Sequence, residues 1–488
     1  MTTTAALSLR ELLVVEDDAA IAEFRCTHTG ILLWPLIRTV FLRMLLSDLH
    51  YNTPLIMGSG IARPPARRAV ATLARSVLHN TLAKAKSGWH ADICIMTDAL
   101  GTRLVEGRWF NRLSDHFALA LPDRSIVVED HWEWNWPMPR HFPKLLFHSP
   151  WQAQCALVDR LVVHNAHREP ARRLIALVAA RARRHLDWDL GAQRAEVTTE
   201  MLARKLAGLP SKLRAYRAML ERIGPRVLLL NSACYGPLSP VIAAARGLGI
   251  VVAEFQHGAV SCGHDGYNIA AALRQSSAYR ASLPDYFLSY GKWWSEQIDM
   301  PVGKVAIGNP HRDAQLRNVR PNPGGRVVLL LGDGIETTKY LAFAAALAAA
   351  LRPRGLEVVF RPHPIERSQP CIVDHDSSQG VRLDLLPDIY ESLAGAHIVI
   401  SEQSSGLFEA IGYAEKIFVW DTTKSRFGFP EHPFHRVDSA PALALALERP
   451  DAGRVAEQAA RDIWAPDWRK NYSAFLQSCG AAETQDPP

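Results

Sequence analysis

The sequence has few cysteines, and none in a spacing that would indicate a metal site or a disulfide framework. Its seven cysteines are scattered over 488 residues, without a C-x-x-C pair or a Cys/His ligand spacing. No D-x-D pair of carboxylates stands at the end of a predicted strand either. We therefore expect a protein of a reducing compartment that needs no metal and no other cofactor.

A long hydrophobic run is also missing. The most apolar stretch, residues 31–46, is interrupted by Pro35, Arg38 and Arg43, whereas a membrane-spanning helix needs about 20 mostly apolar residues. The N-terminus lacks the basic region of a signal peptide and carries acidic residues soon after a short apolar run. These absences predict a cytoplasmic chain without a membrane span. We expect the stretch 31–46 to pack against the first predicted sheet, with peripheral attachment to the inner membrane as the alternative.

Acidic residues are absent from residues 61–90, which contain six lysines and arginines, and a second basic region follows in residues 168–217. Solvated helix faces explain such patterns; attraction to anionic lipid head groups or to an anionic glycan is the alternative. Neither region carries a nucleic-acid motif, so we expect no nucleic acid partner. The basic residues are Arg63, Arg67, Arg68, Arg75, Lys84 and Lys86, then Arg168, Arg172, Arg173, Arg181, Arg183, Arg184, Arg204, Lys205, Lys212, Arg214 and Arg217.

The alternation of apolar runs with helical stretches predicts an α/β protein. A chain of this length exceeds one ordinary core, and residues 226–258 have the pattern of a strand, a helix and a second strand, which is a βαβ unit. The expected parts are a helical segment 1–87, a first Rossmann-like domain 88–307, a linker 308–325, a second Rossmann-like domain 326–452, and C-terminal helices with a polar tail 453–488.

Ten short apolar runs are predicted to be buried parallel strands. They are Ala91–Thr97, Ser125–Val128, Arg160–His164, Val227–Asn231, Val251–Gln256, Tyr286–Ser289, Val327–Leu331, Leu356–Arg361, His397–Ser401 and Lys416–Trp420. Helices are expected in the second domain at 338–352, 387–394 and 404–414. Ligands of such sheets bind at the carboxyl ends of the strands, so residues that directly follow a strand are the candidates for a site.

Three strand-end loops of the second domain are candidates for binding a nucleotide. Glycines flank Asp333 after one strand, so backbone N–H groups can close on phosphate there. Two prolines stiffen His363 after the next strand, and Ser405 stands where a helix should begin, with Glu409 near the same face for ribose hydroxyls. Each of these features also has a structural alternative. The glycines beside Asp333 can serve packing, His363 can cap a turn, and Ser405 can be an N-cap that binds no ligand. The candidate donor-binding residues are Gly332, Asp333, Gly334, Arg361, His363, Pro364, Ser404, Ser405 and Glu409.

The loop 254–267 is the candidate catalytic element of the first domain. His257 directly follows a predicted strand, and His264 and Asp265 stand on the same glycine-rich loop. Two histidines and an aspartate are more than a solvated loop needs. We predict His257 as the catalytic base and Asp265 as the second candidate. The expected cleft-lining residues are Gln256, Gly258, His264 and Asn309.

Five motifs then stand in a fixed order along the chain. They are QHG (256–258), PDYFLSYGKWW (284–294), GNPHRD (308–313), RPHP (361–364) and SEQSSGLFEA (401–410). Together they resemble bacterial capsule and lipopolysaccharide biosynthesis glycosyltransferases with the GT-B fold. Their spacing is also similar to that of CDP-glycerol glycerophosphotransferases and of CMP-Kdo and sialic acid transferases. The resemblance covers about residues 225–425.

This resemblance implies an α/β fold of the GT-B type, with two Rossmann-like domains facing a central cleft and an N-terminal helical segment. It also implies that His363 and Pro364 contact the donor nucleotide, that the serine pair 404–405 binds its phosphate, and that the loop 256–258 borders the reacting sugar. The sequence departs from the CMP-sugar families in one respect, because the acidic-acidic-glycine motif of their base has no copy in the first domain.

On these grounds the sequence predicts a metal-independent glycosyltransferase. It would move a sugar from a CMP-, CDP- or UDP-linked donor to a growing bacterial surface polysaccharide, capsule or lipopolysaccharide. The expected partners are the nucleotide sugar, a glycan or lipid-linked glycan acceptor, and an anionic membrane surface through the basic N-terminal helices. Two alternatives stay open, an enzyme similar to UDP-N-acetylglucosamine 2-epimerase and a non-catalytic subunit of a polysaccharide assembly complex.

Overall fold

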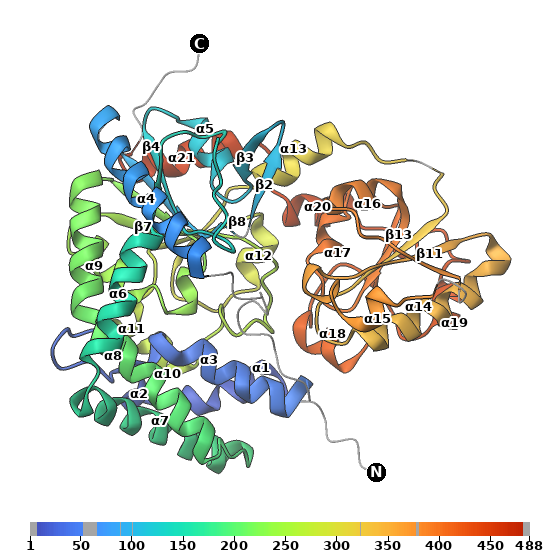
Figure 1. Ribbon diagram of the computed structural model, residues 1–488. Coiled ribbons are helices and arrows are strands. Elements are labelled where there is room, and N and C mark those ends of the chain that lie inside the picture. Colours follow the sequence, from blue (N-terminus) through green and yellow to red (C-terminus); the bar gives the residue numbers. More distant parts are fainter. Residues whose placement is uncertain are drawn as a thin grey trace.

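The computed structural model describes residues 7–51, 66–87, 89–99, 101–322, 324–376 and 380–481. Figure 1 shows two lobes that face each other, one blue to yellow and one orange, with the last helix of the chain lying on the first lobe. Arg63, the side chains of Lys84 and Lys86, and the polar tail from residue 482 onward lie outside the described residues.

The first lobe is built on a sheet of seven parallel strands. Their order is β5 (Leu145–Phe147), β4 (Ser125–Glu129), β1 (Ile93–Thr97), β6 (Val227–Leu230), β7 (Val251–Phe255), β8 (Tyr286–Ser289) and β9 (Gly303–Ala306). Successive side chains point to opposite faces. Ile93 and Ile95 therefore pack with α5 (Asp115–Ala120) and α21 (Trp468–Ser478), whereas Cys94 and Met96 pack with α8 (Ala192–Ile223) and α9 (Ser239–Arg246). Burial on both faces explains the unbroken apolar runs.

The second lobe is built on a sheet of six parallel strands. Their order is β12 (Val381–Leu383), β11 (Glu357–Arg361), β10 (Val327–Leu331), β13 (Ala396–Ser401), β14 (Lys416–Trp420) and β15 (His435–Val437). Helices α14 (Thr337–Leu351) and α19 (Ala440–Ala446) cover one face, and α16 (Ile389–Gly395) and α17 (Gly406–Glu409) cover the other. Counted along the chain this is the order 3-2-1-4-5-6 of the Rossmann fold.

Both sheets thus reverse their strand order at an inner strand, between β1 and β6 and between β10 and β13. Side chains from both lobes line a common pocket. The predicted fold is therefore confirmed: the protein is α/β with GT-B architecture, two Rossmann-like domains that face a central cleft, and an N-terminal helical segment.

The N-terminal segment is part of the first lobe. It holds α1 (Leu9–Leu12), α2 (Ala19–Ala22) and α3 (Trp34–Leu46), and α3 packs on α8 and on the turn that follows β6. Arg38 of α3 is fully buried and forms ion-paired hydrogen bonds of 2.7 and 2.8 Å with Glu16. The apolar stretch 31–46 is therefore core, and its side chains are not available to a membrane.

The C-terminal helices cross back to the first lobe. The chain leaves the second lobe through α20 (Glu457–Ile463), and α21 then packs Trp468 and Tyr472 against Phe117, with ring centroids 5.8 and 5.0 Å apart. Helices were predicted for this stretch. Their return to the first domain was not, because helical periodicity does not say which neighbour a helix packs on.

Several predicted elements need correction. The run Arg160–His164, predicted as a strand, mostly belongs to α6 (Ser149–Val162), because a short apolar run does not distinguish a strand from a helix. The helix predicted over 404–414 is the single turn α17. The hairpin of β2 (Thr102–Val105) and β3 (Arg108–Asn111) and the edge strands β5, β9, β12 and β15 were not predicted, since three or four residues carry little pattern.

The remaining helices complete the covering layers. They are α4 (Ala66–Ser87), α7 (Asn165–Leu186), α10 (Ala271–Gln275), α11 (Ser277–Ala281), α12 (Lys292–Glu296), α13 (Pro310–Asn318), α15 (Pro370–Val373) and α18 (Thr423–Gly428). Within the described ranges, every helix is too short or too polar to cross a membrane.

Candidate active site

Polar side chains gather where the central strands of the first sheet end. Asp98 follows β1, Asn231 and Ser232 follow β6, and His257 follows β7. The amide of Asn231 donates to the Asp98 carboxylate at 2.7 Å. Strands β1 and β6 are the pair at which the strand order reverses, which is the place where open α/β sheets bind ligands.

His257 is held by groups that leave its ring neutral. Its Nε2 lies 3.3 Å from the Ser232 hydroxyl and its Nδ1 lies 3.4 Å from the Tyr267 hydroxyl, which itself donates to Glu254 at 2.7 Å. Burial lowers the pKa of His257, although the carboxylates of Glu254 and Asp98 act in the opposite direction. A neutral imidazole can accept a proton near pH 7.

The cleft holds a small pocket of about 40 Å³ into which both domains project side chains. His257 lies on the wall of the first domain, Ser405 and Glu409 lie on the wall of the second, and Trp464 comes from the segment that crosses back. The full lining is Arg112, Leu113, His257, Gly258, Ala259, Tyr290, Trp294, Asn309, His311, Ser405, Phe408, Glu409 and Trp464. Of the predicted residues, the structure thus brings together His257, Gly258, Asn309, Ser405 and Glu409.

Arg112 supplies a positive charge to this pocket and was missed in the sequence. Among the described residues its guanidinium has no ion pair and no hydrogen bond, and the side chain is exposed. Its charge lowers the pKa of both His257 and His311, in each case after burial as the larger cause, and His311 falls to about 2. Arg112 follows the hairpin β2–β3, which carries no recognisable motif, so only the structure reveals its position.

Glu409 contributes a carboxylate to the lining of the same pocket. This carboxylate lies close to the Tyr390 hydroxyl, whose pKa it helps to raise after burial as the largest cause, and the neighbouring Ser405 makes no capping hydrogen bond to α17. The pocket therefore has a cationic side at Arg112 and a hydrogen-bond-accepting side at Glu409.

Three predicted residues of the loop 254–267 have structural roles instead. The amide of Gln256 bridges the Gly258 carbonyl and the Tyr290 backbone N–H, both at 2.8 Å. His264 contacts the Tyr235 hydroxyl at 3.2 Å. Asp265, the second candidate for the base, is buried and turned toward Arg43 at 3.7 Å, outside the lining of the pocket. Gln256, His264 and Asp265 therefore hold the loop that presents His257.

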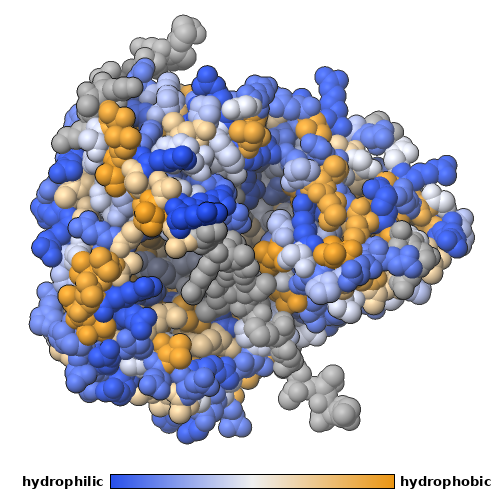
Figure 2. Space-filling view, in the orientation of Figure 1, coloured by the Kyte–Doolittle hydropathy of each residue, from blue (hydrophilic) through white to orange (hydrophobic). Residues whose placement is uncertain are grey.

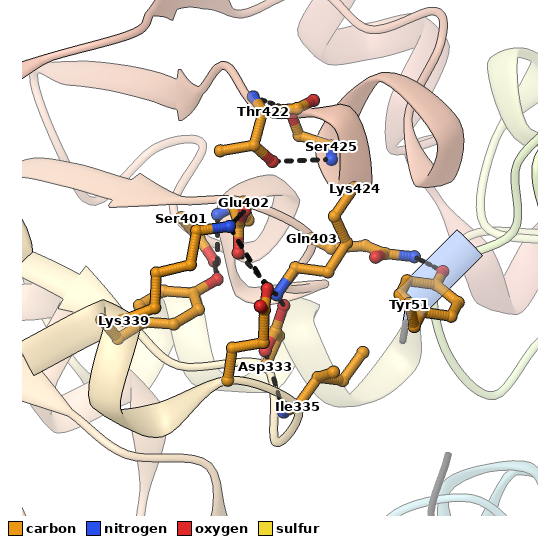
Figure 3. Close-up of polar contacts among 12 residues, drawn as sticks. Tyr51, Asp333, Ile335, Lys339, Ser401, Glu402, Gln403, Thr422, Lys424 and Ser425 are labelled. Carbon is orange, nitrogen blue, oxygen red and sulfur yellow. Dashed lines mark hydrogen bonds and ion pairs between the residues drawn. The ribbon is translucent and has the colours of Figure 1, made fainter. Parts of the chain in front are cut away.

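The loop of Asp333 does not form the expected phosphate site. Lys424 reaches into the end of the second sheet, and its Nζ lies 2.7 Å from Asp333, 3.3 Å from Glu336 and 2.5 Å from Glu402 (Figure 3). A phosphate would meet three carboxylates there. Lys339 balances only part of that charge, with its Nζ 3.3 Å from Glu402.

The two glycines of this loop are explained by packing. A Cβ at Gly332 would lie 2.4 Å from a carboxylate oxygen of Glu366, and Gly334 has a φ of +85°, in the left-handed region that favours glycine. The prediction that Gly332, Asp333 and Gly334 close on a phosphate is therefore not supported by their geometry.

The other residues predicted to bind the donor nucleotide form hydrogen bonds or turns within the second domain. The buried guanidinium of Arg361 donates to Ser392 at 2.8 Å and to Asp384 at 3.2 Å. His363 accepts the Ile365 backbone N–H and so caps the turn that begins at Pro364. The Ser404 hydroxyl accepts the Gly406 backbone N–H at 3.2 Å. None of these four predicted residues, Arg361, His363, Pro364 and Ser404, belongs to the lining of the interdomain pocket.

Comparisons with known proteins add little beyond the fold. No protein-family model matches the chain, and no curated protein matches it. Among solved structures it is similar to a putative UDP-N-acetylglucosamine 2-epimerase from Listeria monocytogenes, at 12% identity and a TM-score of 0.41 over 81% of this chain and 99% of that one.

Two further structures have similar values. One is the UDP-GlcNAc 2-epimerase from Methanocaldococcus jannaschii in complex with UDP-GlcNAc and UDP. It has 12% identity and a TM-score of 0.43, over 80% of this chain and 99% of that one. The other is the wall teichoic acid polymerase TagF, at 10% identity and a TM-score of 0.41, over 85% of this chain and 97% of that one. At this level of identity and structural similarity, the activities of these proteins are not assigned to this chain.

Proposed function

We propose that the protein processes a nucleotide-activated sugar in the interdomain pocket and transfers that sugar to a growing bacterial surface polysaccharide. One observation carries the proposal. The pocket places the unpaired guanidinium of Arg112 and the carboxylate of Glu409 around one cavity, with His257 on its wall. A nucleotide sugar offers the complementary groups, because its phosphates are anionic and its ribose and sugar hydroxyls are donors.

Each group then has a role that follows from its charge. Arg112 binds the phosphates, since a guanidinium makes strong, charge-assisted hydrogen bonds to phosphate oxygens. The Ser405 hydroxyl adds a neutral donor beside them. Glu409 accepts hydrogen bonds from ribose hydroxyls through its pocket-lining carboxylate. A CMP-, CDP- or UDP-linked donor fits this set equally well.

His257 acts as the base in the proposed transfer. Its neutral ring takes the proton of the acceptor hydroxyl while the acceptor oxygen forms a bond to the anomeric carbon. The bond between that carbon and the phosphate oxygen breaks, and the nucleotide leaves with the electron pair. Arg112 stabilises the charge that develops on the leaving phosphate, and such fixed electrostatic groups supply about 3 kcal/mol or more.

A second candidate function is epimerisation of a nucleotide sugar. Two histidines, His257 and His311, line the same pocket, and removal and return of a proton at a sugar carbon needs groups that can exchange protons. Incubation with UDP-GlcNAc and no acceptor separates the two functions. An epimerase forms an isomeric nucleotide sugar, whereas a transferase forms at most the slow hydrolysis products.

The first test is the substitution Arg112→Ala. We expect it to raise the dissociation constant of the tightest-binding nucleotide among CMP, CDP, UDP and GDP by about tenfold to a hundredfold, because one charge-assisted hydrogen-bonding group is lost. Isothermal titration calorimetry measures the change.

Arg317→Ala is the matched control. Arg317 is an exposed arginine of α13 that pairs with Asp313 on its own helix at 3.7 Å, outside the pocket lining. Its substitution should leave the affinity unchanged. Equal nucleotide affinity of the Arg112 variant and the unmodified protein would contradict the proposed phosphate site.

A further inference from the structure

Helix α4 has an unusual distribution of side chains, because its inward face is polar. Thr72, Ser76 and Asn80 point into the first domain and are buried. Thr72 donates to the Trp134 carbonyl at 2.9 Å, and the amide of Asn80 makes two hydrogen bonds of 2.9 Å with the backbone of Phe147. Hydrogen bonds to backbone groups, rather than burial of aliphatic side chains, therefore fix this face of the helix.

The outward face of α4 is aliphatic. Val70, Val77, Leu78 and Leu82 are between 49% and 65% exposed. A helix on the surface of a globular domain normally turns its apolar stripe toward the core. In α4 the arrangement is inverted, so the fold of this domain does not account for these four side chains.

Helix α6 adds aliphatic side chains to the same face of the molecule. Leu157, Leu161 and Val162 are exposed, Leu161 to 74%, and α6 contacts α4. Figure 2 shows apolar side chains gathered over α4 and, below it on the same face, around α6, with hydrophilic side chains between them. We call these seven residues together the α4–α6 surface. Several exposed aliphatic side chains gathered on one face of a domain indicate an interaction site.

The arginines of α4 lack acidic partners in the part of the chain that the structure describes. Arg67, Arg68 and Arg75 of α4 form no ion pair among the described residues, and residues 61–90 contain no carboxylate. The second basic region differs, because most of its arginines have acidic partners. Arg168 pairs with Glu200 at 2.8 Å and Arg181 with Asp18 at 2.9 Å. The positive charge of α4 is thus left for a partner outside the chain.

We propose that the α4–α6 surface docks on an anionic lipid bilayer. Aliphatic side chains enter the boundary between head groups and acyl chains, while the arginines extend to the lipid phosphates on their flexible apolar stems. A second copy of the chain fits less well, because a two-fold contact through this surface would set the arginines of α4 against each other. The proposal stands on α4 and α6 alone and does not depend on the nature of the reaction.

Vesicle flotation of the full-length protein tests the proposal. We expect the protein to float with vesicles of phosphatidylcholine and phosphatidylglycerol at low salt, less at high salt, and little with phosphatidylcholine alone. The triple variant Val77→Ser, Leu78→Ser, Leu82→Ser should lower the partition coefficient by about tenfold or more. The triple variant Arg67→Gln, Arg68→Gln, Arg75→Gln should lower it by about a hundredfold.

The control carries Val373→Ser and Leu445→Ser, two aliphatic residues of the second domain that are 68% and 66% exposed. It should float like the unmodified protein. The pair Leu157→Ser, Leu161→Ser provides a second aliphatic variant on another helix if the α4 variant misfolds. The serine variants should also retain their affinity for nucleotide, which separates this proposal from the proposed function.

Two results would overturn the proposal. One is that the unmodified protein fails to float with anionic vesicles at low salt. The other is equal flotation of the unmodified protein and both aliphatic variants. Self-association that these variants abolish, without any binding to vesicles, would assign the α4–α6 surface to a second copy of the chain instead.

Discussion

His257 illustrates how a local environment sets the chemistry of a single side chain. Burial is the largest cause of its lowered pKa, Glu254 and Asp98 raise it in part, and His264 and Arg112 lower it further. The position of His257 at a strand end could be predicted from the sequence. The charges around it could not, because Asp98 and Arg112 come from chain segments more than a hundred residues away.

The pH dependence of the reaction follows from this environment. We expect the acidic limb of kcat/KM to lie below pH 6.5, the ordinary histidine value, because activity is lost as the pH falls through the lowered pKa of His257. Asp98→Asn removes a charge that raises the pKa of His257, so it should move the acidic limb to lower pH. Arg112→Gln removes a charge that lowers this pKa, so it should raise the pKa.

Rate profiles and an NMR titration of the His257 ring measure these shifts. The titration reports the pKa even in a variant with little activity. Shifts of the same sign in both variants would show that the two charges do not act on His257 as the structure indicates.

At the scale of elements, the short helix α18 shows how an ion-paired side chain anchors a turn. Lys424 is 4% exposed and is surrounded by three carboxylates. Asp333 lies in the loop after β10, Glu336 in the turn before α14, and Glu402 directly after β13. The sequence predicted a phosphate loop at Asp333 from the glycines beside it. It could not show that a lysine from a distant helix occupies this strand end.

Lys424→Met should destabilise the protein by about 3–5 kcal/mol, because it leaves buried carboxylates without a counter-charge. Urea unfolding measures the change. Lys339→Met is the matched control, since Lys339 lies 3.3 Å from the same Glu402 but its side chain is 43% exposed, and it should cost less than about 1 kcal/mol. Adding Asp333→Asn and Glu402→Gln to the Lys424→Met variant should restore most of the lost free energy of unfolding. Equal costs for the two lysine variants would contradict this account.

At the scale of the whole molecule, the two domains meet through backbone as well as side chains. The Ser261 hydroxyl donates to the Gly428 carbonyl, and the rings of Trp294 and Phe408 lie 4.5 Å apart across the cleft. Gly263 also lies close to the backbone of the second domain, because a Cβ there would lie 1.9 Å from the Phe427 carbonyl oxygen. These contacts fix the distance across the interdomain pocket, from His257 on the first domain to Ser405 and Glu409 on the second.

Gly263→Ala should therefore separate the domains slightly and lower kcat/KM by about a hundredfold, since a displacement of roughly 1 Å at reacting groups has that effect. Steady-state kinetics measure the loss, and thermal unfolding should remain cooperative. Gly395→Ala serves as the control, because a Cβ at that position meets no atom within 4 Å. Unaltered kinetics in the Gly263 variant would show that this contact does not set the geometry of the pocket.

The sequence by itself determined the two parallel α/β domains, since unbroken apolar runs of four to six residues follow from burial on both faces of a sheet. It also determined that His257, Ser405 and Glu409 lie near strand ends. The tertiary structure alone decided which of the predicted residues share a pocket, that Arg112 joins them, that Lys424 fills the Asp333 loop and that α4 turns its aliphatic side outward. Those outcomes depend on contacts between residues far apart in the chain, and local periodicity holds no information about such contacts.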